Sequence, residues 1–129
     1  MYQPRDRLIE EAVSRIEHRF TDARLKQHVV AAELGVSASS LSVRFKRASG
    51  VTFSEYLRTT RLARAASLLA ETALSVKEVW ASVGYNDFSN FDHDFKRCFS
   101  VTPREYRTLG RRAMSGVSVA AHLRPRKSD

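Results

Sequence analysis

The sequence contains a single cysteine, Cys98, in 129 residues. One thiol excludes an internal disulfide and a metal site built from several thiolates, and it is typical of a protein from a reducing cytosol. The four histidines are not spaced as ligands of one metal ion, and no glycine-rich loop of the phosphate-binding type is present. We therefore expect no enzymatic activity, no cofactor and no bound metal.

Long apolar runs are also missing. The N-terminal segment is amphipathic rather than uniformly apolar, which does not fit a signal peptide. The longest uncharged stretch near the C-terminus, residues 113–123, is too short to cross a bilayer. We expect a soluble, cytoplasmic protein.

Positive charge, in contrast, is abundant. Lys and Arg number 22 against 14 Asp and Glu, which gives a formal net charge of +8. This balance favours a polyanionic partner such as nucleic acid, although a basic surface also serves solubility alone. Helical periodicity is lost near the C-terminus, where a flexible basic tail either adds nonspecific phosphate affinity or is only a solvated terminus.

A short pattern occurs twice in the sequence, fifty residues apart. Residues 45–56 match residues 95–106 at seven of twelve positions. The similarity continues backwards to Gly35 and Gly84, with one residue inserted in between. Two copies of one small structural unit are therefore expected.

Each copy has the pattern of a helix-turn-helix. A short apolar run ends at Gly35 or Gly84, where glycine can adopt the left-handed conformation that closes a helix. The side chains of Ser37 and Asp87 can accept hydrogen bonds from the free amides of a second helix. The apolar positions of these second helices are Leu41, Phe45 and Ala48 in the first copy and Phe91, Phe95 and Cys98 in the second. A helix-turn-helix can place its second helix in the major groove of DNA.

Further helices are predicted around the first copy. Residues 7–20 have apolar side chains at helical spacing and are expected to form a helix that covers this copy. Thr52 and Glu55 have the spacing of a capping box, which predicts a helix start at that point. Alanine is frequent in the residues that follow, which favours a long helix up to about Glu71.

Two more capping boxes predict the later helices. Ser75 and Glu78 open the second copy. Thr102 and Glu105 precede a last helix that should end near Arg107. The sequence thus predicts an all-α fold of about seven helices. Its parts are an N-terminal helix-turn-helix subdomain at 1–51, a linker helix at 52–72, a C-terminal helix-turn-helix subdomain at 73–108 and a basic flexible tail at 109–129.

A helical wheel separates the inner and outer faces of the two second helices. The outer positions are Ser39, Val43, Lys46 and Arg47 in the first copy and Ser89, His93, Lys96 and Arg97, flanked by Asn90, in the second. These side chains face the groove if the helices read DNA. A solvated helix face is the alternative.

Together these residues resemble the DNA-binding domain of the AraC/XylS family of bacterial transcription regulators. The similarity covers residues 7 to 107. Its main motifs are Ala31-Ala32-Glu33-Leu34-Gly35, Phe45-Lys46-Arg47, Val83-Gly84-Tyr85-Asn86-Asp87, Phe95-Lys96-Arg97 and Val101-Thr102-Pro103. The resemblance implies two helix-turn-helix units joined by a long helix, placed in successive major-groove segments of promoter DNA. It also implies binding as a monomer or through partners, frequent contact with RNA polymerase and a role as an activator.

The resemblance assigns roles to residues of both second helices. Base-facing positions would be Ser39, Ser40, Ser42 and Val43 in the first copy and Ser89, Asn90 and His93 in the second. Candidates for phosphate contact are Lys46, Arg47, Lys96 and Arg97. Because the first set has no Arg, Gln or Asn, we expect it to read through Val43 on thymine methyl groups, serine hydroxyls and DNA shape. The second copy would then carry more of the discrimination.

Three residues depart from the family pattern. Trp80 stands where the first copy has the small Ala31, Phe88 stands where a polar base reader is common, and Asp92 places an anion near the reading face. We interpret Trp80 as accommodated by the small Cys98. Phe88 is interpreted as a half-buried packing residue, with a contact to thymine methyl groups as the alternative.

Two other functions stay open. The helices could form a protein-interaction module without DNA contact, or a DNA binder of architectural type without sequence preference. The length leaves no room for a ligand-sensing domain beside the two copies. We therefore expect either a stand-alone regulator, bound to DNA as a monomer, or the C-terminal part of a longer protein.

Overall fold

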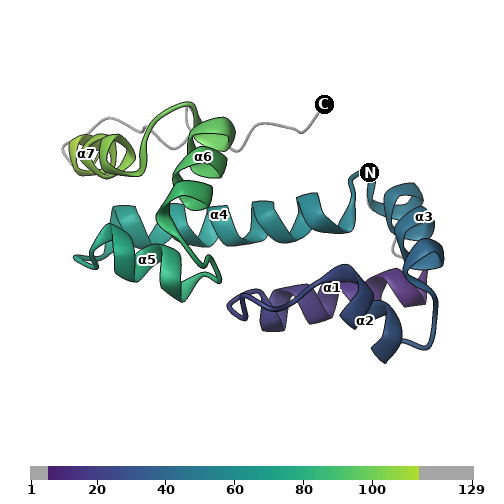
Figure 1. Cartoon of the computed structure of the whole chain (residues 1–129). Coiled ribbons are helices and arrows are strands. Elements are labelled where there is room, and N and C mark those ends of the chain that lie inside the picture. The colour runs from purple at the N-terminus through teal and green to yellow at the C-terminus, as the bar shows by residue number, and fades with distance from the viewer. Residues whose placement is uncertain (1–5, 114–129) are drawn as a thin grey trace. The chain divides into compact units, whose positions relative to one another are not determined.

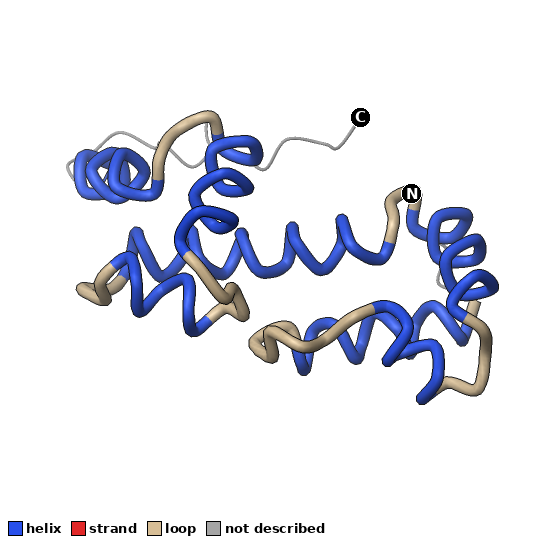
Figure 2. The backbone as a smooth tube through the Cα atoms, viewed as in Figure 1, coloured by secondary structure: helices blue, strands red, loops and turns tan. Residues whose placement is uncertain are grey.

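The computed structural model describes residues 6–113, and within that range it contains seven helices and no strand (Figures 1 and 2). The helices are α1 (Arg7–Arg19), α2 (Gln27–Glu33), α3 (Ala38–Ser49), α4 (Phe53–Glu71), α5 (Val76–Ser82), α6 (Phe88–Phe99) and α7 (Pro103–Ala113). The expected all-α fold, with two helix-turn-helix motifs and a long helix between them in the chain, is confirmed. None of the described helices is long and apolar enough to span a membrane.

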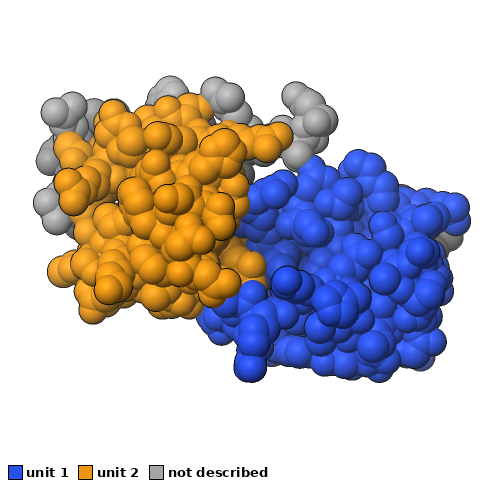
Figure 3. All heavy atoms as spheres, in the orientation of Figure 1, with its two compact units in different colours: residues 1–60 blue, residues 61–129 orange. Residues whose placement is uncertain are grey.

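The chain divides into two compact units, residues 1–60 and 61–129 (Figure 3). The helix-turn-helix of α2 and α3 lies in the first unit, and that of α5 and α6 lies in the second. Helix α4 begins in the first unit and ends in the second. Each helix-turn-helix therefore has a core of its own.

The first unit is held by an aromatic contact between α3 and the start of α4. The ring of Phe45 meets Phe53 edge to face at a centroid distance of 5.6 Å and Tyr56 at 5.7 Å. Such pairs contribute about 0.5–1.5 kcal/mol beyond the burial of their area. The buried core around them comprises Ile9, Ala12, Ile16, Leu25, Val30, Ala31, Leu41, Phe45, Ala48, Phe53 and Leu57.

The second unit repeats this contact at the equivalent positions. The rings of Phe95 and Tyr106 pack edge to face at 5.5 Å, as those of Phe45 and Tyr56 do. Phe99 adds contacts with Phe95 at 4.6 Å and with Tyr106 at 5.3 Å. Burial raises the pKa of the Tyr106 hydroxyl. The two copies inferred from the sequence therefore share one packing scheme.

One core position expected from the periodicity is wrong. Cys98 is only partly buried, and the neighbouring Phe99 takes the third buried position of α6. In α3 the third buried position is Ala48, and Ser49 is only partly buried. Adjacent residues differ by about 100° on a helix, so a phenylalanine beside the expected position can turn inward and bury far more apolar area than the thiol.

The turns and helix starts follow the expected chemistry. Gly35 and Gly84 have φ of 74° and 96°, in the left-handed region. Ser37 Oγ accepts a hydrogen bond from the Ser40 amide at 3.0 Å, and Asp87 Oδ1 accepts one from the Asn90 amide at 2.8 Å. These bonds satisfy amides that have no partner inside the helix.

All three capping boxes are formed. Thr52 with Glu55, Ser75 with Glu78, and Thr102 with Glu105 each exchange two hydrogen bonds of 2.8–3.1 Å between side chain and backbone amide. The amide of the capping residue holds the pKa of the Glu78 and Glu105 carboxyls below its ordinary value of 4.5. The charged carboxylates therefore fix the starts of α5 and α7.

Helix α7 is longer than expected. It continues past Arg107 to Ala113, so the predicted tail is wrong for residues 109–113. The rest of that tail, residues 114–129, lies outside the described residues. Glycine is unfavourable inside a helix, but a Cβ at Gly110 would lie 3.3 Å from the Cβ of Ala70 on α4. Glycine thus permits a close approach of α7 to α4.

Arg107 ties α7 to the end of α4. Its Nε donates to the Leu69 carbonyl oxygen at 3.0 Å, and its Nη2 donates to the carbonyl oxygens of Thr72 and Leu74. Carbonyl groups at a helix C-terminus lack partners within the helix, and a cation is favourable there. A side chain far away in the sequence therefore caps α4.

Replacing Arg107 by methionine should destabilise the second unit. The change removes a charged donor from three carbonyl groups and is expected to lower the free energy of unfolding by about 1–3 kcal/mol. Urea unfolding followed by the fluorescence of Trp80, the only tryptophan and a residue of this unit, measures the effect. Arg104→Met, an exposed change on the same helix, is the matched control and should stay within about 0.5 kcal/mol of the wild type. Equal losses in the two variants would contradict the capping role.

The stability of the second unit should depend on the two acidic caps. The folded-state pKa of Glu78 and Glu105 is lowered, so their contribution is complete above the ordinary value of 4.5. It is lost as the pH falls through the lowered pKa. Glu78→Gln with Glu105→Gln keeps an acceptor for each amide and removes the titration. Urea midpoints measured from about pH 6 to about pH 3 should therefore fall less steeply in the double variant than in the wild type. Identical slopes would show that these carboxylates contribute nothing to the acid sensitivity.

Candidate nucleic-acid interface

The candidate reading residues of α3 lie on one side of the helix. Leu41 and Phe45 are wholly buried, whereas Ser39 and Val43 are exposed, with 56% of the Val43 surface accessible. Ser40 and Ser42 are partly buried and lie at the edges of this face. The burial of the opposite side therefore leaves an apolar side chain at the centre of the exposed face.

The corresponding face of α6 is polar. Ser89, Asn90 and His93 are all exposed, opposite the wholly buried Phe91 and Phe95. The structure thus brings together on each helix the side chains that the wheel grouped. Their role as base-facing residues stays a prediction.

Four cations lie in the last turns of these helices. Lys46 and Arg47 are exposed on α3, and Lys96 and Arg97 are exposed on α6. Lys96 forms an ion pair with Asp92, with Nζ to Oδ2 at 3.2 Å. The other three cations form no ion pair with any residue in the described range. They keep their full charge available for a phosphate group.

The two helices differ in charge. Besides Lys46 and Arg47, α3 carries Arg44 and no acidic residue. Helix α6 carries Asp92 and Asp94 beside its two cations. The potential over the exposed face of α3 is therefore the more positive of the two.

The side-chain amide of Asn90 has a fixed orientation. Its Nδ2 donates to Asp87 Oδ2 at 3.0 Å, while Asp87 Oδ1 accepts from the Asn90 backbone amide. The carboxylate of Asp87 is only an acceptor, so it determines which end of the amide is the donor. The second N–H and the carbonyl oxygen of Asn90 remain as the donor and acceptor that an adenine edge requires.

A polar contact on the flank of each second helix was not foreseen from the sequence. Arg44 donates to both carboxylate oxygens of Asp6, at 2.9 and 3.4 Å. Asp6 also accepts from the Leu8 amide and so caps α1. At the position equivalent to Arg44, Asp94 accepts a hydrogen bond from the Tyr85 hydroxyl at 2.8 Å. The two contacts hold α3 and α6 within their own units through different chemistry.

Helices α1 and α2 are joined by a shared carboxylate. Glu33 Oε1 accepts from Arg15 Nε at 3.1 Å and from Arg19 Nη1 at 2.6 Å. The hydrogen bond from Arg19 holds the pKa of the Glu33 carboxyl below its ordinary value. This contact positions the first helix of the helix-turn-helix against α1. In the sequence, only the opposite charges of Glu33 and the two arginines indicated this contact.

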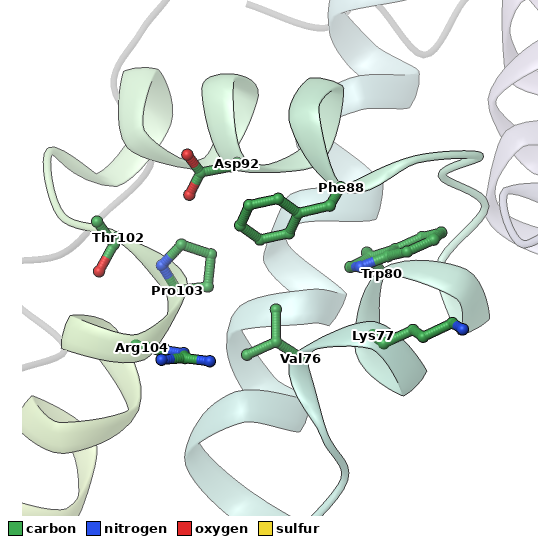
Figure 4. A pocket seen from close by; sticks show the side chains of 8 residues that line it. All are labelled: Val76, Lys77, Trp80, Phe88, Asp92, Thr102, Pro103 and Arg104. Atoms are coloured by element: carbon green, nitrogen blue, oxygen red, sulfur yellow. The ribbon is translucent and has the colours of Figure 1, made fainter.

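Trp80 lies at the surface rather than in the core. It is partly buried and lines a groove with Phe88, half of whose surface is exposed (Figure 4). The interpretation that Cys98 makes room for Trp80 in the core is therefore wrong. At this point of α5 the tryptophan lines the groove together with Phe88, the first residue of α6.

No group of His, Cys, Asp and Glu residues suited to a metal ion occurs in the part of the chain that the structure describes. The polar side chains gathered on α3 and α6 can form hydrogen bonds and bind anions. These are the interactions by which helices contact the phosphates and base edges of DNA.

Comparisons with known proteins agree with this geometry. Residues 30–109 match the family described as a helix-turn-helix domain. The xylose operon regulatory protein of Haemophilus influenzae is 34% identical over 102 residues, which cover 79% of this chain and 26% of that protein. The chain spans between 13% and 26% of the length of the first curated relatives that it matches.

Two solved structures share the fold at 31% sequence identity. The C-terminal domain of AraT, a response regulator from Geobacillus stearothermophilus, has a TM-score of 0.81, with 83% of this chain and 88% of that chain covered. A transcriptional regulator of Chromobacterium violaceum, described among AraC-type DNA-binding domain-containing proteins, has a TM-score of 0.72, with 80% and 91% covered. With its two matching helix-turn-helix units, the chain belongs to the AraC/XylS family.

Proposed function

We propose that this chain is the DNA-binding part of a transcription regulator and binds double-stranded promoter DNA with sequence specificity. Helices α3 and α6 would each enter their own segment of the major groove. The observation that carries the proposal is the repeat. At equivalent positions of α3 and α6, an aromatic ring is buried while polar and cationic side chains are exposed on the opposite side. Family membership supports the same role.

The two helices would divide affinity and discrimination between them. The more positive α3, with Lys46 and Arg47 unpaired among the described residues, would contribute phosphate contacts that carry no sequence information. Helix α6 would contribute the oriented amide of Asn90 and the imidazole of His93, which can pair with base edges. Lys96 and Arg97 would bind phosphate groups of the DNA backbone beside α6.

Val43 is proposed as the main base contact of α3, with Ser39, Ser40 and Ser42 around it. An aliphatic side chain can recognise thymine in the major groove through the C5-methyl group. Val43 and Phe88 are the two exposed large hydrophobic residues of the described range, and each lies on one of the two proposed reading helices.

The remaining parts of the proposal rest on family membership alone. They are a role as an activator, binding to DNA as a monomer, contact with RNA polymerase, and a location in the cytoplasm, where a bacterial chromosome lies. The proposed role requires no catalytic chemistry, because binding energy alone directs a regulator to its site.

Binding-site selection from random duplex DNA at near-physiological salt tests the proposed function. We expect one enriched sequence with two short blocks, since two helices read it. Asn90→Ala and His93→Ala should each reduce the sequence preference in one block only. Each should weaken binding to the selected site by about 1–3 kcal/mol. Lys46→Gln should weaken binding to all sequences alike and reduce its salt dependence.

Two outcomes of the selection would contradict the proposal. Salt-sensitive binding without an enriched sequence would indicate an architectural DNA binder. Absence of binding in the selection, and also in a repeat at low salt, would indicate a protein-interaction module. A sharper block for α3 than for α6 would overturn only the division of roles between them.

Uracil substitution tests the contact of Val43. Each thymine of the selected site is replaced in turn by uracil, which removes the methyl group alone. At one position in the α3 block we expect a loss of about 0.8 kcal/mol, roughly fourfold in affinity. Val43→Ala should abolish this preference for thymine over uracil, whereas Ser39→Ala, the control, should keep the ratio even if total affinity falls. The assignment fails if Val43→Ala retains the full thymine preference.

A further inference from the structure

The second unit contains a groove between α5, the start of α6 and the start of α7 (Figure 4). Its volume is about 580 Å³. Four of the residues that line it are apolar: Val76 and Trp80 on α5, Phe88 on α6 and Pro103 on α7. Small-molecule sites in proteins have volumes of about 300–1,000 Å³ and similar apolar and aromatic linings.

The charged residues around the groove leave a surplus of positive charge. Lys77 and Arg104 are exposed, and neither forms an ion pair with another described residue. The carboxylate of Asp92 is paired with Lys96 at 3.2 Å, so its charge is already balanced. In Figure 4 the Arg104 side chain extends toward Val76, while the Lys77 ammonium lies at the outer rim. The groove therefore favours an anion over a cation.

The corresponding positions of the first unit carry other residues. The position of Trp80 is taken there by the buried Ala31, and that of Phe88 by Ala38. Gln27, at the position of Val76, donates through Nε2 to the Ala38 carbonyl oxygen at 3.1 Å and so joins the starts of α2 and α3. Valine cannot form that bond. The second unit thus replaces a polar bridge between helices by an aromatic-walled groove.

We propose that this groove binds a small aromatic carboxylate, with the ring between Trp80 and Phe88 and the carboxylate on Arg104. A planar ring can stack on or meet the edges of both aromatic side chains. A guanidinium matches a carboxylate with two parallel hydrogen bonds. The site would take its ligand whether or not the chain binds DNA, so it goes beyond the proposed function and does not depend on it.

A ligand at this site would touch the proposed reading helix of the second unit. Phe88 is the first residue of α6 and precedes Ser89, and Asp92 lies one residue before His93. Occupancy would therefore be linked to any partner that α6 binds, because two ligands that contact one helix influence each other's affinity reciprocally.

Titration with three matched compounds tests the proposal. Phenylpropionate and the corresponding alcohol and amine share one aromatic ring and differ in the terminal group, which is anionic, neutral and cationic in turn. Trp80 is the only tryptophan, so its fluorescence reports on the groove directly. We expect saturable binding of phenylpropionate with a Kd on the order of 100 µM. The alcohol should bind at least about fivefold more weakly and the amine more weakly still, because each loses or opposes the contact with Arg104.

Three variants separate the contributions. Arg104→Gln should reduce the affinity for phenylpropionate to that for the alcohol and leave the alcohol unchanged. Phe88→Ser should weaken both compounds. Arg24→Gln removes an exposed cation of the first unit and, as the control, should change nothing. Circular dichroism of each variant establishes that it is folded.

The proposal is overturned if phenylpropionate produces no saturable change at millimolar concentration, or if Arg104→Gln leaves the preference for the carboxylate intact. Equal binding of all three compounds would also overturn it. That result would indicate an unselective apolar surface of the kind that a protein partner covers.

Discussion

The orientation of both candidate reading helices depends on one aromatic contact that occurs twice. Phe45 and Phe95 point into the cores of their units and meet Tyr56 and Tyr106 of the next helix edge to face. A helix is rigid about its axis, so burying one side determines which side faces solvent. The exposure of Val43 and His93 is therefore a consequence of the burial of the opposite side of each helix.

The two units reach the same helix orientation by different polar contacts. Arg44 joins α3 to the cap of α1, whereas Asp94 joins α6 to the Tyr85 hydroxyl. Equivalent positions therefore have opposite charges while they serve the same purpose. One result is that α3 keeps a purely basic surface and α6 a mixed one. The internal repeat thus preserves a geometry and allows the electrostatics of each copy to differ.

The second unit also differs from the first in the core and the C-terminal end of its second helix. Phe99 adds a third ring to the core of α6, and Ser100 ends the helix at φ 69°, where the first unit has Gly50 at φ 83°. A residue with a side chain costs about 1–2 kcal/mol in this conformation. Larger aromatic burial offsets that cost. Trp80 and Phe88 lie outside this enlarged core and form the walls of the groove.

The sequence by itself determined the elements, because helix starts, glycine turns and apolar spacing are local properties. Seven helices, three capping boxes and the two exposed faces follow from residues close together in the chain. Only the tertiary structure decided the contacts between distant residues. They include the bonds of Arg107 to α4, the salt bridge from Arg44 to Asp6, the close approach at Gly110, the burial of Phe99 in place of Cys98 and the position of the partly buried Trp80 in the groove. Each depends on which side chain fills the space between two packed helices, and the period of one helix alone contains no information on its neighbour.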